Sequence, residues 1–220
     1  MKPERDTNKR TTRRDRWWVY GERATELYDA IRDLDHVLAL ARVSDVLIPV
    51  RVATGPVFAE LAVVFALSDY ASLATLSSSV HSVWTIRYAS TLETRIRYAS
   101  SDVFLTLPRP RTTKTLAELG KELDWKRREL MLGRSWGLTS TYNRVHDPDC
   151  HDLAVVRLRD IHVAIDEAVM AAYGWEDLDL KIGHHPTKIG IRWTVGKEAR
   201  FELLDRLLEE NLRRYQLENS

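Results

Sequence analysis

The stretch VVFALSDYASLATLSSSVHSVW (residues 63–84) joins a strand pattern to a helix pattern, and this combination decides the fold class. Its first residues complete a largely apolar run, Val57–Leu67, which predicts a mostly buried strand. A helix directly after that strand is predicted by four apolar residues at helical spacing, Leu73, Leu76, Val80 and Trp84. The first half of the chain therefore has a mixed α and β pattern.

Similar patterns extend outward from this stretch. They predict a helix over Trp17–Leu34 and strands over Val37–Val43, Val46–Ala53 and Thr94–Tyr98. In the second of these strands Val46, Ile48, Val50 and Val52 share one face and Arg51 lies on the other, and in the third Ile96 faces inward while Arg95 and Arg97 face outward.

The second half is predicted to be mainly helical. A capping-box pattern at Thr115 and Glu118 precedes one apolar stripe, Leu116, Leu119, Leu123 and Leu130. A second stripe consists of Leu158, Ile161, Ile165, Ala168 and Ala172, and a third of Phe201, Leu204, Leu208 and Tyr215. A short strand, Ile189–Val195, is expected before the last helix.

The balance of charged residues changes near residue 112, where the mixed first half of the chain meets the helical second half. Residues 1–16 form a basic arm with seven Lys/Arg and three Asp/Glu. Residues 1–112 hold 16 basic and 13 acidic residues, whereas residues 113–220 hold 17 and 19, and the Pro- and Thr-rich stretch LPRPRTTKT (107–115) reads as a linker. We therefore expect an α+β protein in which a mixed α/β domain at 17–110 precedes a mainly helical domain at 111–216.

Composition excludes several classes of protein. The 220 residues carry a net charge of only +1 and are 44% hydrophobic, which indicates a globular chain without a uniformly basic surface. The one cysteine excludes an internal disulfide and fits a reducing compartment. The polar start and an apolar run no longer than Leu61–Leu67 predict a cytoplasmic protein with no membrane partner.

Motifs of common enzymes are missing. The sequence has no GxGxxG, Walker-type, GxSxG or HExxH pattern, no Asn-Pro-Pro-aromatic tetrapeptide and no Gly-rich loop for S-adenosylmethionine. The HDPDCH cluster (146–151) holds metal-ligand residue types, but a polar turn before a helix beginning near Asp152 explains it better. Cys150 is expected to be an unreactive thiol, and His162 and Asp166 a surface pair on one helix face.

Basic and hydroxyl residues of the first half form a pattern suited to DNA. Arginine makes bidentate contacts to guanine and phosphate, and serine permits close approach to the backbone. The alternative is a solvated sheet face with a Ser-rich helix packed on a strand. Trp17 and Trp18 could stack on bases, but anchoring of the first helix in the core is the favoured interpretation. The residues expected to face DNA are Arg42, Arg51, Ser78, His81, Arg95 and Arg97.

The chain also resembles the C-terminal region of MmeI-like bacterial restriction-modification enzymes and related adenine-specific DNA methyltransferases. The resemblance extends in order over nearly the whole chain from residue 17. It rests on WWVYGERATELYDAI (17–31), VLALARVS (37–44), VVFALSDYASLATLSSSVHSVW (63–84), LETRIRYASSDVFLTLPRP (92–110), GLTSTYNRVHDPD (137–149), LRDIHVAIDEAVMAAYGW (158–175) and EARFELLDRLLEENLRRY (198–215).

The resemblance implies a target-recognition domain at about 17–110 and a helical domain at about 111–216. Family members transfer a methyl group from S-adenosylmethionine to adenine N6, and many also cleave DNA in defence against foreign DNA. The chain lacks the motifs for either reaction, so we expect it to be inactive alone and to use no cofactor itself. Asp45 stands where a basic residue is expected, which weakens the case for a phosphate contact there.

Three hypotheses follow. In the first, the chain recognises double-stranded DNA for a methyltransferase or endonuclease subunit encoded separately. In the second, it is a non-catalytic interaction protein that docks a partner through its helical half. The third, a free-standing hydrolase or metalloenzyme using His146, Asp149 or His151, has the least support.

Overall fold

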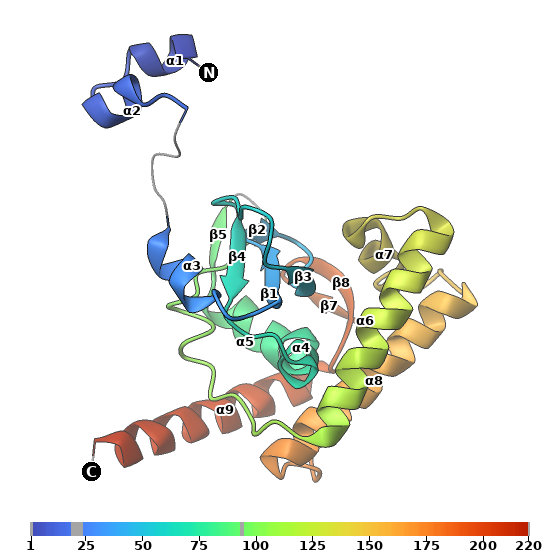
Figure 1. Cartoon of the computed structure of the whole chain (residues 1–220). Coiled ribbons are helices and arrows are strands. Elements are labelled where there is room, and N and C mark those ends of the chain that lie inside the picture. Colours follow the sequence, from blue (N-terminus) through green and yellow to red (C-terminus); the bar gives the residue numbers. More distant parts are fainter. Residues whose placement is uncertain (1, 19–23, 93–94, 220) are drawn as a thin grey trace. The chain divides into compact units, whose positions relative to one another are not determined.

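The computed structural model describes residues 2–18, 24–92 and 95–219. The chain divides into two compact units, Met1–Leu34 and Asp35–Ser220. The N-terminal unit contains three short helices, α1 (Lys2–Asp6), α2 (Thr11–Asp15) and α3 (Thr25–Ala30) (Figure 1). Among the described residues, no helix is long and apolar enough to cross a membrane.

The helix predicted over residues 17–34 is much shorter in the structure. Only α3 is helical there, and residues 19–23 lie outside the described part. Trp17 and Trp18 precede α3 and make an edge-to-face contact with ring centroids 5.9 Å apart. Trp18 is 66% exposed, so its predicted place in the core is wrong.

The second unit begins with a three-stranded antiparallel sheet. Its central strand, β1 (His36–Ala41), pairs with β3 (Val50–Ala53) on one side and β4 (Ala62–Phe65) on the other. The two outer strands are shorter than predicted. Val46, Leu47 and Ile48 are all buried in succession and lead into Pro49, which has no N–H for a ladder, while Val57 and Leu61 are exposed.

The helix predicted from Leu73 to Trp84 consists of two helices, α4 (Tyr70–Ser77) and α5 (Ser79–Tyr88). Ser78 separates them because its backbone is extended, with φ −74° and ψ 158°. Its hydroxyl then accepts a hydrogen bond from the His81 N–H at 3.3 Å and so caps α5. Asp69 caps α4 in the same way through the Ser72 N–H.

A second small sheet follows α5. It has the order β2 (Val43–Ser44), β6 (Arg95–Arg97) and β5 (Ser90–Leu92), and both pairings are antiparallel. The expected strand at 94–98 is therefore present in its described part.

The rest of the unit is mainly helical. It contains α6 (Lys114–Arg134), α7 (Leu138–Val145), α8 (Leu153–Tyr173), a hairpin of β7 (Gly183–Thr187) and β8 (Gly190–Thr194), and α9 (Lys197–Glu218). The cap of α6 is Thr113, whose hydroxyl accepts from the Leu116 N–H, so the capping box predicted at Thr115 and Glu118 is wrong. The strand predicted at 189–195 is confirmed by β8.

The predicted apolar face of α9 is also wrong. Ala199, Leu203 and Leu207 form the buried face. Of the four predicted residues only Leu204 packs against the core, and the other three, Phe201, Leu208 and Tyr215, are exposed. The predicted stripe and the observed buried face both have helical spacing, so periodicity alone does not show which of the two is buried.

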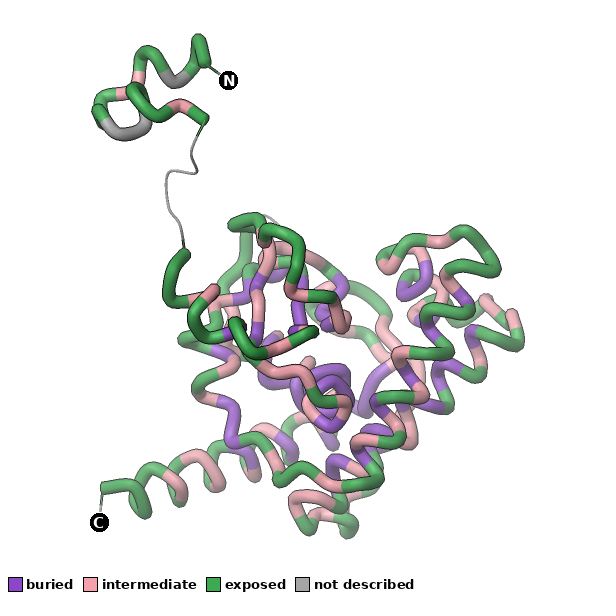
Figure 2. The backbone as a smooth tube through the Cα atoms, viewed as in Figure 1, coloured by how far each residue is buried: buried purple, intermediate pink, exposed green. Residues whose placement is uncertain are grey.

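The main core lies where α4, α6 and α8 meet (Figure 2). α6 and α8 run side by side, and α4 approaches α6 at Gly120. A Cβ atom at Gly120 would overlap the Tyr70 carbonyl oxygen, so this contact requires glycine. Leu73, Leu123 and Ile165 are completely buried around it.

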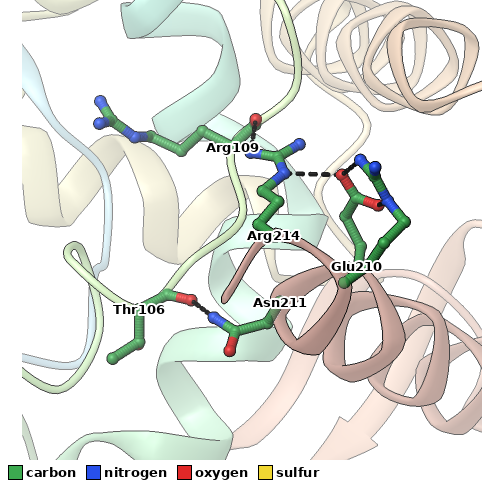
Figure 3. A network of polar contacts seen from close by, with 6 residues as sticks. Thr106, Arg109, Glu210, Asn211 and Arg214 are labelled. Atoms are coloured by element: carbon green, nitrogen blue, oxygen red, sulfur yellow. Dashed lines mark hydrogen bonds and ion pairs between the residues drawn. The ribbon is translucent and has the colours of Figure 1, made fainter. Parts of the chain in front are cut away.

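The last helix binds Arg109 in the segment predicted as a linker (107–115) and Thr106 just before that segment (Figure 3). The Asn211 amide donates to the Thr106 carbonyl, and Arg214 donates to the Arg109 carbonyl at 2.8 Å. Arg214 also pairs with Glu210 at 2.6 Å. Hydrogen bonds from Arg213 and then Arg214 lower the pKa of Glu210 to about 2, which keeps this network charged.

These elements make the protein α+β, as predicted. Residues 35–220 form one compact unit that includes strands of the first half and helices of the second. The division into domains at residues 110–111 stays a prediction.

Candidate functional site

The exposed side of the β5–β6 ribbon carries two of the predicted site residues. Arg95 and Arg97 are exposed on β6 while Ile96 between them is 4% exposed, as the alternation predicts. The register places Leu92 opposite Arg95 and Ser90 opposite Arg97. Directly opposite residues of an antiparallel pair share a face. We call these four residues, Ser90, Leu92, Arg95 and Arg97, the ribbon face.

Arg42 lies next to this sheet, between β1 and β2. Its N–H donates to the Leu61 carbonyl at 2.7 Å, and its own carbonyl accepts from the Tyr98 N–H at 2.8 Å. The side chain is half-buried, and its Nε is enclosed. Arg42 thus joins the two sheets through its backbone, and its predicted contact with DNA stays a prediction.

Arg51 is held by the protein itself. Its Nε donates to the Ser68 carbonyl at 3.0 Å, and its guanidinium lies 5.0 Å from the centre of the Tyr70 ring. These contacts fasten β3 to the start of α4. The structure therefore gives Arg51 a packing role and does not bring it into the ribbon face.

Ser78 and His81 lie inside the protein, so the prediction that they occupy an exposed helix face is wrong. Ser78 is 1% exposed and His81 0%. The His81 Nδ1–H donates to the Leu76 carbonyl at 2.7 Å, and its Nε2 accepts from the Tyr98 hydroxyl at 2.9 Å. Burial lowers the pKa of His81 to about 4, so the ring is neutral at pH 7.

A second histidine–tyrosine pair connects α7, which carries Tyr142, to α8, which carries His162. The Tyr142 hydroxyl donates to His162 Nε2 at 2.9 Å, and burial lowers the pKa of His162 to about 4. Asp166, one turn later, accepts from the Ser79 N–H at 2.6 Å. The predicted surface pair of His162 and Asp166 is therefore wrong, because both are buried and each bonds a different element.

The cluster at 146–151 is a structural turn. Asp152 caps α8, and Asp147 accepts from the Asp149 N–H at 3.0 Å. Among the described residues, no three His, Cys, Asp or Glu side chains are placed to hold a metal ion. Cys150 is half-buried.

Arg159 organises this turn, and it is not among the residues predicted from the sequence. Its guanidinium is buried and donates to the carbonyl oxygens of four residues, Arg144, Val145, Asp147 and Cys150. Its place on the buried stripe of α8, one residue after Leu158, is the signal that could have identified it.

Of three comparisons with known proteins, one found a match. No protein-family model matches the chain, and no curated protein matches it. Among solved structures, the chain is similar to the type IIL restriction-modification enzyme MmeI in complex with DNA, with a TM-score of 0.56 and 16% sequence identity. The likeness is one of fold. It covers 83% of this chain but only 22% of the MmeI chain.

Proposed function

We propose that this chain is the DNA-recognition portion of a bacterial adenine-N6 methyltransferase or restriction-modification enzyme. The observation that carries the proposal is the ribbon face, the side of the β5–β6 pair of a three-stranded sheet on which the exposed residues Arg95 and Arg97 lie. A two-stranded β-ribbon fits the major groove of DNA, and arginine recognises guanine edges and phosphates there. The fold likeness to MmeI, solved with DNA, supports the same assignment.

The proposal assigns only recognition to this chain. Methyl transfer from S-adenosylmethionine, and cleavage where it occurs, belong to a catalytic subunit in the cytoplasm. The sequence has no methyl-donor loop and no Asn-Pro-Pro-aromatic tetrapeptide, and the MmeI chain is several times longer than the part to which this chain is similar.

The test is binding to a pool of random-sequence duplexes, followed by selection and sequencing, alone and with a cognate methyltransferase subunit. We expect salt-dependent binding, because each phosphate contact contributes about 0.9 to the slope of log K against log salt. The Arg95→Ala/Arg97→Ala variant should lose about 1 to 2 units of that slope, or relax the selected sequence.

Lys121→Ala/Arg128→Ala is the matched control, since it removes the same charge from exposed positions on α6. It should bind as the wild type does. Absence of duplex binding at low salt, both alone and with the subunit, contradicts the proposal.

A second function, partner docking through the helical half, is favoured by one observation. α9 exposes a stripe of apolar side chains on the side away from the core, Phe201, Leu208, Leu212 and Tyr215. Arg95→Ala/Arg97→Ala separates the two functions. If the variant keeps its association with a subunit and loses DNA, recognition is supported; if only association is measurable in the wild type, docking is the function.

A further inference from the structure

A small cavity lies apart from the ribbon face, at the place where the β7–β8 hairpin meets α7, α8 and the junction of α4 and α5. Its volume is about 60 Å³. The apolar part of its wall includes Leu47, Ile48, Val145 and Ile189, and the polar part includes Ser77, Tyr142, His146, His162, Arg192 and Trp193. No residue of the ribbon face lines it.

Three lining residues have buried polar atoms that no described protein group satisfies. These atoms are Ser77 Oγ, Arg192 Nε and Trp193 Nε1. The Ser77 residue is only 3% exposed. One terminal nitrogen of Arg192 donates a hydrogen bond to the Ile191 carbonyl at 2.9 Å. The Nε–H of the same side chain has no acceptor among the described protein groups. Buried polar groups in native proteins nearly always have a partner, so three at one cavity call for an acceptor there, either an ordered water or a bound ligand.

The histidines of the wall are neutral, and this leaves the cavity rich in donors. His146 Nδ1 accepts from the Trp193 N–H at 3.1 Å, so the ring proton is on Nε2. Burial, followed by the charge of Arg192, lowers the pKa of His146 to about 3. His162 is likewise neutral and accepts from Tyr142.

Arg192 brings one positive charge to the cavity wall and Asp45 one negative charge. Arg192 is half-buried, and the acidic group that acts on it is Asp45, an exposed residue on the wall whose charge is screened by solvent. Arg159 and Arg127, from α8 and α6, also act on the cavity histidines as positive charges. The surroundings therefore favour an acceptor with one negative charge.

We propose that this cavity binds a small monocarboxylate of the size of acetate or propionate. The carboxylate oxygens would accept from the donors of Ser77, Arg192 and Trp193, and the short aliphatic part would contact the apolar wall. Apolar side chains such as Leu47, Ile48 and Ile189 make up part of the wall, and a short aliphatic group complements them whereas a phosphate has none. The volume of about 60 Å³ is that of a few non-hydrogen atoms, which fits a short-chain acid.

The test follows the Trp193 indole N–H by NMR while sodium acetate or propionate is added, with sodium chloride and sodium phosphate as parallel titrations at equal ionic strength. Trp193→Phe assigns the resonance. We expect a saturable shift for the carboxylates, with a Kd on the order of 1 mM, as for a ligand of four or five heavy atoms.

Arg192→Gln should weaken this binding about tenfold or more, because it removes the positive charge on the wall that complements the ligand. Lys188→Gln, which removes a charge from the exposed turn of the same hairpin, is the matched control and should leave the Kd unchanged. If Arg192→Gln does not fold, Ser77→Ala takes its place. Absence of a saturable carboxylate shift, a response to phosphate or chloride instead, or an unchanged Kd in the Arg192 or Ser77 variant overturns the proposal.

Discussion

At the scale of single residues, the sequence separates the exposed arginines from the buried polar groups only in part. Alternation around Ile96 correctly predicts that Arg95 and Arg97 face outward, because the period of a strand is strict. Ser78 and His81 are misplaced, since a serine or histidine on a helix reads as polar and therefore exposed. Their burial depends on Tyr98 and Leu76, which satisfy His81 from positions that no local pattern reveals.

Asp166 provides a test of such buried polar groups. Burial raises its pKa to about 7, against about 4 in the unfolded chain. Between these values the folded protein holds a proton that the unfolded chain has lost. The stabilisation is therefore complete below pH 4, declines as pH rises and is lost above pH 7, by at most about 1.4 kcal/mol per pH unit.

Asp166→Asn removes this titration and keeps an oxygen that can accept from the Ser79 N–H. We expect the free energy of unfolding of the variant, relative to the wild type, to rise by about 2 kcal/mol from pH 5 to pH 8. Both proteins contain the same buried histidines, so the difference isolates Asp166. Urea unfolding at the two pH values measures it, with Asp160→Asn on the exposed side of α8 as the matched control. A difference that does not change with pH contradicts the prediction.

At the scale of elements, the types of helix and strand are predicted better than their limits. The helical second half and the stripe of α8 are confirmed, with Leu158, Ile161 and Ile165 buried. The strand limit near Pro49 is missed because apolar residues continue on both sides of it. The break at Ser78 is missed because Leu76, Val80 and Trp84 keep helical spacing across the serine run. The face of α9 is missed because two apolar stripes on one helix have the same period, and only packing decides which is buried.

Gly120 gives the sharpest test at this scale. Alanine is the better helix former by about 1 kcal/mol, yet a methyl group here would overlap the Tyr70 carbonyl of α4. We expect Gly120→Ala to destabilise the protein by about 2 kcal/mol or more, since overpacking against backbone forces the two helices apart.

Gly133, in the same helix, is the matched control because nothing lies within 4 Å of its Cβ position. Gly133→Ala should raise the free energy of unfolding by about 0.5 to 1 kcal/mol. Urea unfolding of both variants measures the pair. Equal effects of the two substitutions would show that α4 and α6 do not approach as described.

At the scale of the whole molecule, a predicted linker is part of the folded unit. Thr106 and Arg109 are bound by side chains of α9, and Ser79 in the first half is bound by Asp166 in the second. Contacts between residues so distant in sequence cannot be read from local pattern. Hydrogen bonds therefore connect the two halves of the chain, and their division into separate domains at residues 110–111 stays a prediction.

We expect residues 35–220 to unfold cooperatively. Hydrogen exchange with mass spectrometry in increasing denaturant should show α5 and α8 losing protection at the same concentration. Asp166 of α8 accepts from the Ser79 N–H at the start of α5, and both helices contribute to the core. Peptides from α3, which belongs to the other unit, serve as the reference for exchange outside residues 35–220. Protection that persists in α8 after α5 has opened would instead support independent domains divided near residue 110.

The ribbon face has a consequence for how the protein can change over generations. Its two arginines alternate with a buried isoleucine, so exchanging either guanidinium leaves the anchoring side chain and the strand pairing in place. Selection can therefore alter what this surface contacts at little cost to folding. In contrast, a change at His81 or Gly120 disturbs the core directly, so heritable variation is expected to concentrate on the ribbon face and to avoid these buried positions.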